Sequence, residues 1–213
     1  MNNRRIVALK VAAWLACLEP VFLLLYKYFT HDLTANPIEF ITDTTGTATL
    51  VLLLVTLAIT PVRKFTGLNW LIRFRRLTGL FAFFYVLLHF STYLGLDIQF
   101  DWHQVSVDLT KRPFIIVGFI AFVLMIPLAV TSTAWAIRKM GGKKWNLLHK
   151  LIYVSAVFGI IHFWWKVKAD HAEPATYGAI LAVLLLARVV IWVRSRMKRP
   201  PAAKQPEPAL AGD

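Results

Sequence analysis

The feature that most limits the fold of this chain is a series of apolar runs, each close to 20 residues long. They cover about residues 8–29, 45–60 with its flanks, 78–96, 113–131, 148–165 and 175–193. A helix of this length spans the roughly 30 Å hydrocarbon core of a bilayer. The runs lack the alternating polarity of membrane strands, and backbone groups in lipid must be satisfied within the segment. The sequence therefore predicts an all-α polytopic membrane bundle with six transmembrane helices.

Basic residues are distributed unevenly between the two ends of the predicted helices. Most of the 24 Lys and Arg residues fall at one end, in segments 4–10, 63–76, 138–150 and 194–204. The opposite end holds most of the acidic residues and only a few cations. The positive-inside rule then places both termini in the cytoplasm. The net charge of +13 is thus explained by topology and by contact with anionic membrane lipid, and we expect no nucleic-acid partner.

The chain is predicted to form one domain followed by a tail. Residues 1–195 would form the membrane domain, and residues 196–213, rich in proline and alanine, a disordered cytoplasmic tail. Cys17 is the only cysteine, which excludes an internal disulfide and a thiolate metal site. The chain also lacks a glycine-rich nucleotide fingerprint, so any electrons it carries must come from a separate donor.

Two histidines lie in the middle of predicted spans. His89 follows Arg75 by fourteen residues and His162 follows His149 by thirteen, so both lie roughly 20 Å from the basic end of their helices. An ionisable residue inside the membrane is a candidate functional residue by default. Two imidazoles at one depth on two helices can provide both axial ligands of one haem. A haem held by His89 and His162 is the leading hypothesis, and proton carriage or simple packing by the histidines is the alternative.

The role of His149 is open to more than one interpretation. His149 would supply a second metal ligand near the cytoplasmic face, but the residue at that level on the other helix is Arg75. Arginine clamps a haem propionate well and is a very poor iron ligand. An unbroken helix would also place His149 about 140° around the axis from His162. One haem or two, or a His149 that only forms hydrogen bonds, remain alternatives.

A carboxyl group also interrupts the first span, where Glu19 precedes Pro20. The proline is expected to kink this helix. Glu19 is interpreted as protonated, as paired with an arginine from another helix, or as part of a proton or quinone site, with pairing slightly favoured.

Four stretches resemble the MsrQ (YedZ) family. They are AITPVR (58–63), RRLTGLFAFFYVLLHFSTY (75–93), KRPFIIVGFIAFVLMIPLAVTS (111–132) and KWNLLHKLIYVSAVFGIIHFWW (144–165). The resemblance covers about residues 5–195. MsrQ proteins are haem-bearing subunits of a bacterial inner-membrane system that repairs oxidised methionine in periplasmic proteins. The family is similar in turn to the transmembrane ferric-reductase domain of NADPH oxidases and metalloreductases, which holds two haems between two pairs of histidines.

The resemblance implies roles for particular residues. His89 and His162 match the outer pair of haem b ligands, and His149 matches one inner ligand. Arg75 stands where the oxidases have their other inner histidine, so the chain departs from the pattern there. The family is also associated with FMN, which the inner residues Arg63, Lys64, Arg73 and Arg76 would contact if they do not contact a donor protein instead.

The resemblance also implies partners. The acceptor would be MsrP, a periplasmic molybdopterin enzyme that reduces methionine sulfoxide, docked on acidic outer loops such as 97–108. The donor would be the quinone pool or a cytosolic flavin reductase. The alternative is a transmembrane haem ferric reductase, or another quinol-linked cytochrome b, that acts without MsrP.

Overall fold

The computed structural model describes residues 3–197, and this part is mostly helical, with short loops and no strand. Six helical segments are long and apolar enough to cross a membrane, as predicted. The elements are α1 (Asn3–Phe29), α2 (Pro37–Thr66), η1 (Asn69–Phe74), α3 (Arg75–Thr92), η2 (Tyr93–Asp97), α4 (Trp102–Lys111), α5 (Pro113–Val130), α6 (Ala134–Met140), α7 (Gly142–Leu148), α8 (Leu151–Lys166) and α9 (Ala172–Met197). Helix α9 continues two residues past the predicted start of the tail, and the rest of the predicted tail lies outside the described residues.

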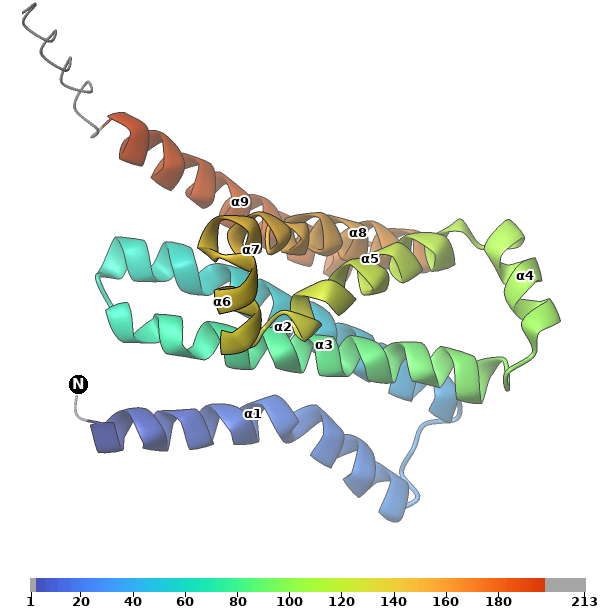
Figure 1. Cartoon of the computed structure of the whole chain (residues 1–213). Helices are drawn as coiled ribbons and strands as arrows, with labels where there is room; N and C mark the ends of the chain where they lie inside the picture. The colour runs from blue at the N-terminus through green and yellow to red at the C-terminus, as the bar shows by residue number, and fades with distance from the viewer. Residues whose placement is uncertain (1–2, 198–213) are drawn as a thin grey trace, which may run out of the picture.

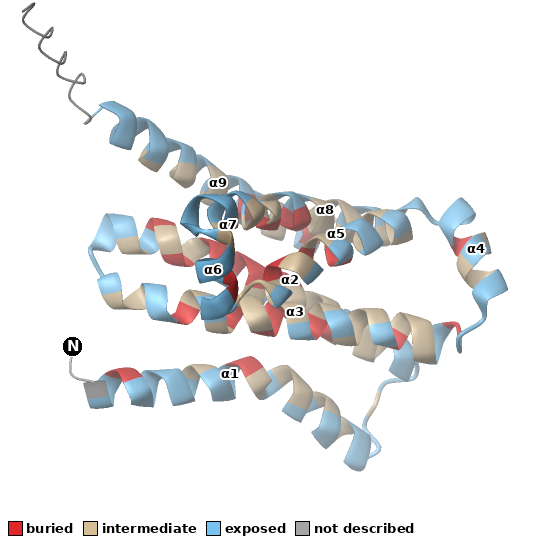
Figure 2. Cartoon of the chain, in the orientation of Figure 1, coloured by how far each residue is buried: buried red, intermediate tan, exposed pale blue. Residues whose placement is uncertain are grey.

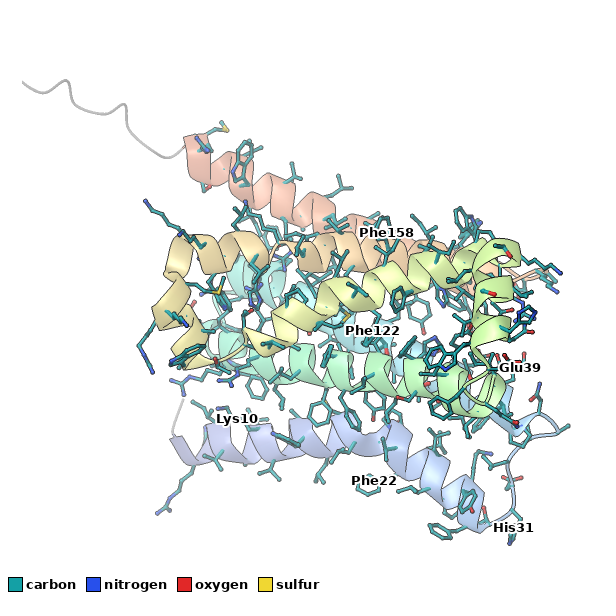
Figure 3. The ribbon with its side chains drawn as sticks, turned by 45° about the vertical axis from the view of Figure 1, so that its right-hand side comes forward. Lys10, Phe22, His31, Glu39, Phe122 and Phe158 are labelled. Atoms are coloured by element: carbon teal, nitrogen blue, oxygen red, sulfur yellow. The ribbon has the colours of Figure 1, made fainter. Side chains whose placement is uncertain are left out.

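The long helices run up and down between two ends of the bundle (Figure 1). The starts of α1, α3 and α8 lie at one end, with η1, α6, α7 and the last turns of α9. The α1–α2 loop and α4 lie at the other end. In Figure 3, Lys10 labels the first end, and His31 and Glu39 label the second. The basic segments of the sequence therefore gather at one end, which is called the inner end below, and the opposite end is called the outer end.

The core lies between α2, α3, α5 and α8 (Figure 2). Leu53 and Leu57 of α2 are almost fully buried, as are Ala82 of α3 and Ala156 of α8. Small side chains let membrane helices approach closely, and two polar contacts accompany them. Thr56 and Thr78 share a hydrogen bond of 2.8 Å between α2 and α3. Ser155 of α8 donates to the carbonyl of Ala121 in α5, at 2.9 Å.

Helices α1 and α9 lie at the edges of this core and expose most of their apolar side chains (Figure 2). Exposed apolar surface of this kind suits a lipid environment. Helix α1 is held to α3 where Tyr85 donates its hydroxyl proton to the carbonyl of Cys17, at 2.7 Å. This bond falls next to Pro20, whose ring disrupts the helical hydrogen bonds nearby. The bundle consequently has a buried centre of four helices, with α1 and α9 less buried at its edges.

Candidate functional site: a pair of intramembrane histidines

His89 and His162 meet in the outer half of the bundle, as their matched depth predicts. His89 lies in the last turn of α3, and His162 lies one turn before the end of α8. Their ring centres are 6.0 Å apart and the rings are nearly perpendicular. Two imidazoles that share one metal ion through nitrogen–metal bonds of about 2 Å have ring centres ~6 Å apart. The spacing of the pair therefore fits two axial ligands of one iron.

The Nδ1 atom of each ring faces a backbone carbonyl. His89 Nδ1 lies 2.9 Å from the oxygen of Thr42 in α2, and His162 Nδ1 lies 2.7 Å from the oxygen of Phe114 in α5. A carbonyl oxygen can only accept a hydrogen bond, so the proton of each neutral imidazole belongs on Nδ1. Nε2 then keeps its lone pair and can bind a metal ion. Metal-binding histidines are commonly oriented by such a bond from their other nitrogen.

Two glycines make these close contacts possible. Gly46 follows Thr42 by one turn of α2, and Gly118 follows Phe114 by one turn of α5. A helical side chain covers the turn that precedes it, so a glycine leaves the carbonyl four residues earlier uncovered. A Cβ atom at Gly118 would lie 2.5 Å from Nδ1 of His162, and one at Gly46 would lie 3.1 Å from Nδ1 of His89. Neither glycine is among the residues predicted from the sequence, although a glycine inside an apolar helix is unfavourable enough to indicate a packing role.

Aromatic side chains surround the pair, and an ion pair lies beside it at the outer end of the bundle. The ring of Phe114 lies 5.8 Å from that of His162. Phe122 of α5, labelled in Figure 3, stacks on Phe90 of α3 with ring centres 5.0 Å apart. At the outer end, Lys166 of α8 forms an ion pair with Asp43 of α2, next to Thr42. The site thus has flat apolar side chains on which a porphyrin can pack, and a polar border near the membrane surface.

His149 occupies a break in the helix rather than a regular turn. Helix α7 ends at Leu148 and α8 begins at Leu151, so the angular count for an unbroken helix does not apply. The Nε2 atom of His149 lies 3.1 Å from the hydroxyl oxygen of Thr131. Its ring stacks on Trp145 with ring centres 3.8 Å apart. The structure thus gives His149 a hydrogen-bond partner, and no second histidine faces it among residues 3–197.

The predicted basic residues all lie at the inner end, but they differ in exposure. Arg75 begins α3 and is partly buried. Arg63 is also partly buried, and its Nε atom is hidden without a hydrogen-bond partner among the described residues. The other three of the predicted group are exposed: Lys64, Arg73 and Arg76.

Two further polar residues of the spans differ from expectation. Glu19 is exposed on α1 and forms no ion pair among residues 3–197, so the favoured pairing with an arginine is wrong. It lies on the outward side of a helix whose inward contact is made by Cys17. Arg188 received no role from the sequence, yet it points into the bundle and binds Tyr153 and the carbonyl of Leu57.

Comparison with known proteins agrees with this geometry. The family described as "Ferric reductase like transmembrane component" matches residues 45–160, which include His89 and end two residues before His162. A "Protein-methionine-sulfoxide reductase heme-binding subunit MsrQ" from Ralstonia nicotianae is 52% identical over 184 residues, covering 85% of each chain. Proteins with the same name from Herminiimonas arsenicoxydans and Rhodospirillum rubrum are 51% and 46% identical, over 87% and 88% of this chain.

These relatives match nearly their whole length, at 85%, 86% and 90% of their own chains. The chain belongs to the MsrQ family, within the wider group of ferric reductase like transmembrane components.

Proposed function

We propose that the chain is a haem b electron-transfer subunit that passes electrons across the bacterial inner membrane to a periplasmic methionine sulfoxide reductase of the MsrP type. His89 and His162 are the proposed haem ligands. The observation that carries the proposal is their pairing at 6.0 Å with both Nδ1 atoms engaged by backbone carbonyls. The printed names of the relatives, which call them heme-binding subunits of a protein-methionine-sulfoxide reductase, support it.

The chain contributes ligation, orientation and burial to this activity. A bound haem supplies one-electron redox chemistry, while the protein sets its position and environment. The carbonyls of Thr42 and Phe114 hold the two rings. An iron bound by both imidazoles would have no open position. That favours electron transfer over reaction with oxygen. The aromatic side chains of α3 and α5 exclude water from the site.

Electrons are proposed to enter at the inner end. With the positive-inside orientation, this end and both termini face the cytoplasm. Quinol in the bilayer and a cytosolic flavin reductase are the proposed donors. Lys64, Arg73 and Arg76 are exposed there and suit an FMN phosphate or an acidic donor surface, because Lys and Arg bind phosphate and carboxylate groups. His149 is the proposed ligand if a second haem is present.

Electrons are proposed to leave at the outer end, which lies nearer the histidine pair. The acidic docking surface is smaller than the sequence suggests. Asp97 and Asp101 are exposed, but Asp108 is only 1% exposed. It accepts hydrogen bonds from Tyr93 and Gln104 and lies 3.5 Å from Arg112. Asp108 therefore fixes α4 in place, and an acceptor meets a surface of mixed charge.

A second function is compatible with the same site. The family model is named for ferric reductases, and a bis-histidine haem can also serve a ferric reductase or another quinol-linked cytochrome b that acts without MsrP. The two functions share the haem ligands and differ in the acceptor, so a direct test of the acceptor separates them.

The test uses the purified full chain, loaded with haem, in vesicles of bacterial lipid. The haem is reduced chemically without oxygen, and the excess reductant is removed. We expect the reduced spectrum to persist until both an MsrP-type reductase and methionine sulfoxide are added, and then to return to the oxidised form. A ferric chelate, added alone to a parallel sample, should reoxidise the protein much more slowly.

Three results would count against the proposal in different ways. Rapid reoxidation by the ferric chelate without response to the reductase would favour the alternative function. Persistence of the reduced spectrum after both the reductase and methionine sulfoxide are added would show that the reductase is not the acceptor. A wild-type protein that binds no haem despite ample supply would exclude both redox functions and favour a transporter or structural protein.

A further inference from the structure

Arg188 is held inside the bundle by a carbonyl that a proline leaves free. Pro61 has no N–H group, so the carbonyl of Leu57, one turn earlier in α2, lacks its helical hydrogen bond. Arg188 of α9 donates from Nη2 to this oxygen at 2.6 Å. It also donates from Nη1 to the hydroxyl oxygen of Tyr153 in α8, at 2.7 Å. The guanidinium group is therefore fixed between three helices.

The positive charge of Arg188 has no counter-charge in the described part of the chain. The three ion pairs there involve Lys27, Arg112 and Lys166, all at the outer end. Both oxygens that bind Arg188 belong to neutral groups, and its Nε atom is buried without any partner. A cation in the membrane interior is costly unless an anion or strong dipoles compensate it. A bound anion would supply the counter-charge that Arg188 lacks.

Other unpaired donors and cations surround the same level of the bundle. Arg75 begins α3 at this level, because Thr56 of α2 is hydrogen-bonded to Thr78 of α3 and the two helices run in opposite directions. One turn further towards the inner end, Thr60 of α2 is therefore level with the first turn of α3. Thr60 lies next to Pro61, and its hydroxyl is buried without a partner. Thr56 in the same helix donates its hydroxyl proton to the carbonyl one turn back, so the unpaired Thr60 is not a general property of α2.

We propose that Arg188, Arg75 and Thr60 form a binding site for an oxyanion at the inner level of the bundle. The ligand is the carboxylate or phosphate of a bound cofactor, namely a haem propionate or the phosphate of FMN. The inference rests on the proposed function for the presence of such a cofactor. Guanidinium groups bind both anions with two parallel hydrogen bonds, and Arg188 has unused donors.

A lipid phosphate is a poorer candidate for this position. Arg188 precedes the end of α9 at Met197 by nine residues, which places it roughly 13 Å from that end. Its guanidinium group points inward to α2 and α8 instead of along α9 towards the headgroups. Arg194 lies closer to the end of the same helix and is exposed, so it can meet the headgroups without entering the bundle.

The experiment compares two pairs of probes that differ in their anionic groups. Haemin is compared with its dimethyl ester, and FMN with riboflavin, by titration into the full-length protein prepared with limited haem supply. We expect the wild type to bind the anionic member of at least one pair about tenfold more tightly, since a hydrogen bond to a charged group is worth about one decade of affinity. Arg188→Gln should remove this preference and leave the affinity for the neutral member unchanged. The pair that responds identifies the ligand.

Controls separate an anion site from a purely structural arginine. Arg194→Gln removes an exposed charge from the same helix and should keep the preference. Arg188→Lys keeps the charge without the paired donors and should retain part of it. If Arg188→Gln does not fold, Thr60→Val gives a second test and should weaken only the anionic member.

A preference that survives Arg188→Gln, or a wild type that shows none, would overturn the inference. If haem still binds at His89 and His162 in that case, the proposed function stands. If neither haemin nor FMN binds the wild type, both fail together.

Discussion

Replacing Gly118 by alanine is expected to lower the affinity for haem by about 10–100-fold, the range found when a group that orients a metal ligand is lost. The new Cβ atom would lie 2.5 Å from Nδ1 and 2.8 Å from Cε1 of His162. The ring would have to move and lose its bond to the carbonyl of Phe114. Glycine-to-alanine changes in a helix otherwise favour folding by up to about 1 kcal/mol, so a loss here points to the ring. Haem titration of the purified variant measures the effect.

Two other glycines provide matched controls for this prediction. A Cβ atom at Gly46 would lie 3.1 Å from the ring of His89, so Gly46→Ala should weaken haem binding less than Gly118→Ala does. Gly159 lies in α8, three residues before His162, with no atom within 4 Å of an added Cβ. Gly159→Ala should bind haem as the wild type does. Equal affinity in all three variants would show that close approach to the rings is unimportant.

Removing either histidine of the pair is expected to have the largest effect. His89→Ala and His162→Ala should each lower haem affinity by more than about 100-fold, because loss of a ligand exceeds the cost of losing a group that only orients one. The reduced-minus-oxidised spectrum and the haem-to-protein ratio of the purified variants measure this loss. His149→Ala should leave the spectrum of the haem held by the pair in place, because His149 lies at the other end of α8.

The behaviour of His149→Ala also decides the number of haems. If the haem-to-protein ratio is two in the wild type and one in His149→Ala, His149 is a ligand of a second haem. An unchanged ratio would restrict His149 to its hydrogen bond with Thr131. A His89→Ala variant that keeps a full complement of haem would contradict the assignment of the pair.

The six helices and the histidine pair could be predicted from the sequence because both follow from distances along the chain. The length of an apolar run determines a membrane span, and the rise per residue determines depth, so the sequence alone puts His89 and His162 at one level. The direction in which a side chain points around its helix axis is less predictable. The break between α7 and α8 removes the angular relation between His149 and His162, and no property of the residues there specifies that break.

Contacts between distant helices were also beyond prediction from the sequence. The role of Arg188 depends on a carbonyl that Pro61 frees on another helix, 131 positions away in the chain. The roles of Gly46 and Gly118 depend on which helices pack against the histidines. Asp108 looks like a docking acid in sequence, and only the fold of α4 shows that it is buried. In each case the residue type indicates that the position is unusual, but the sequence does not specify which distant residue it contacts.

The most direct test of the central claim is the electron paramagnetic resonance spectrum of the oxidised, haem-loaded wild type. We expect a low-spin ferric signal of the kind given by two imidazole ligands, lost in both His89→Ala and His162→Ala and retained in His149→Ala. A high-spin signal in the wild type would mean that one axial position is open, and would contradict ligation by the pair. Retention of the low-spin signal in either variant of the pair would contradict it equally.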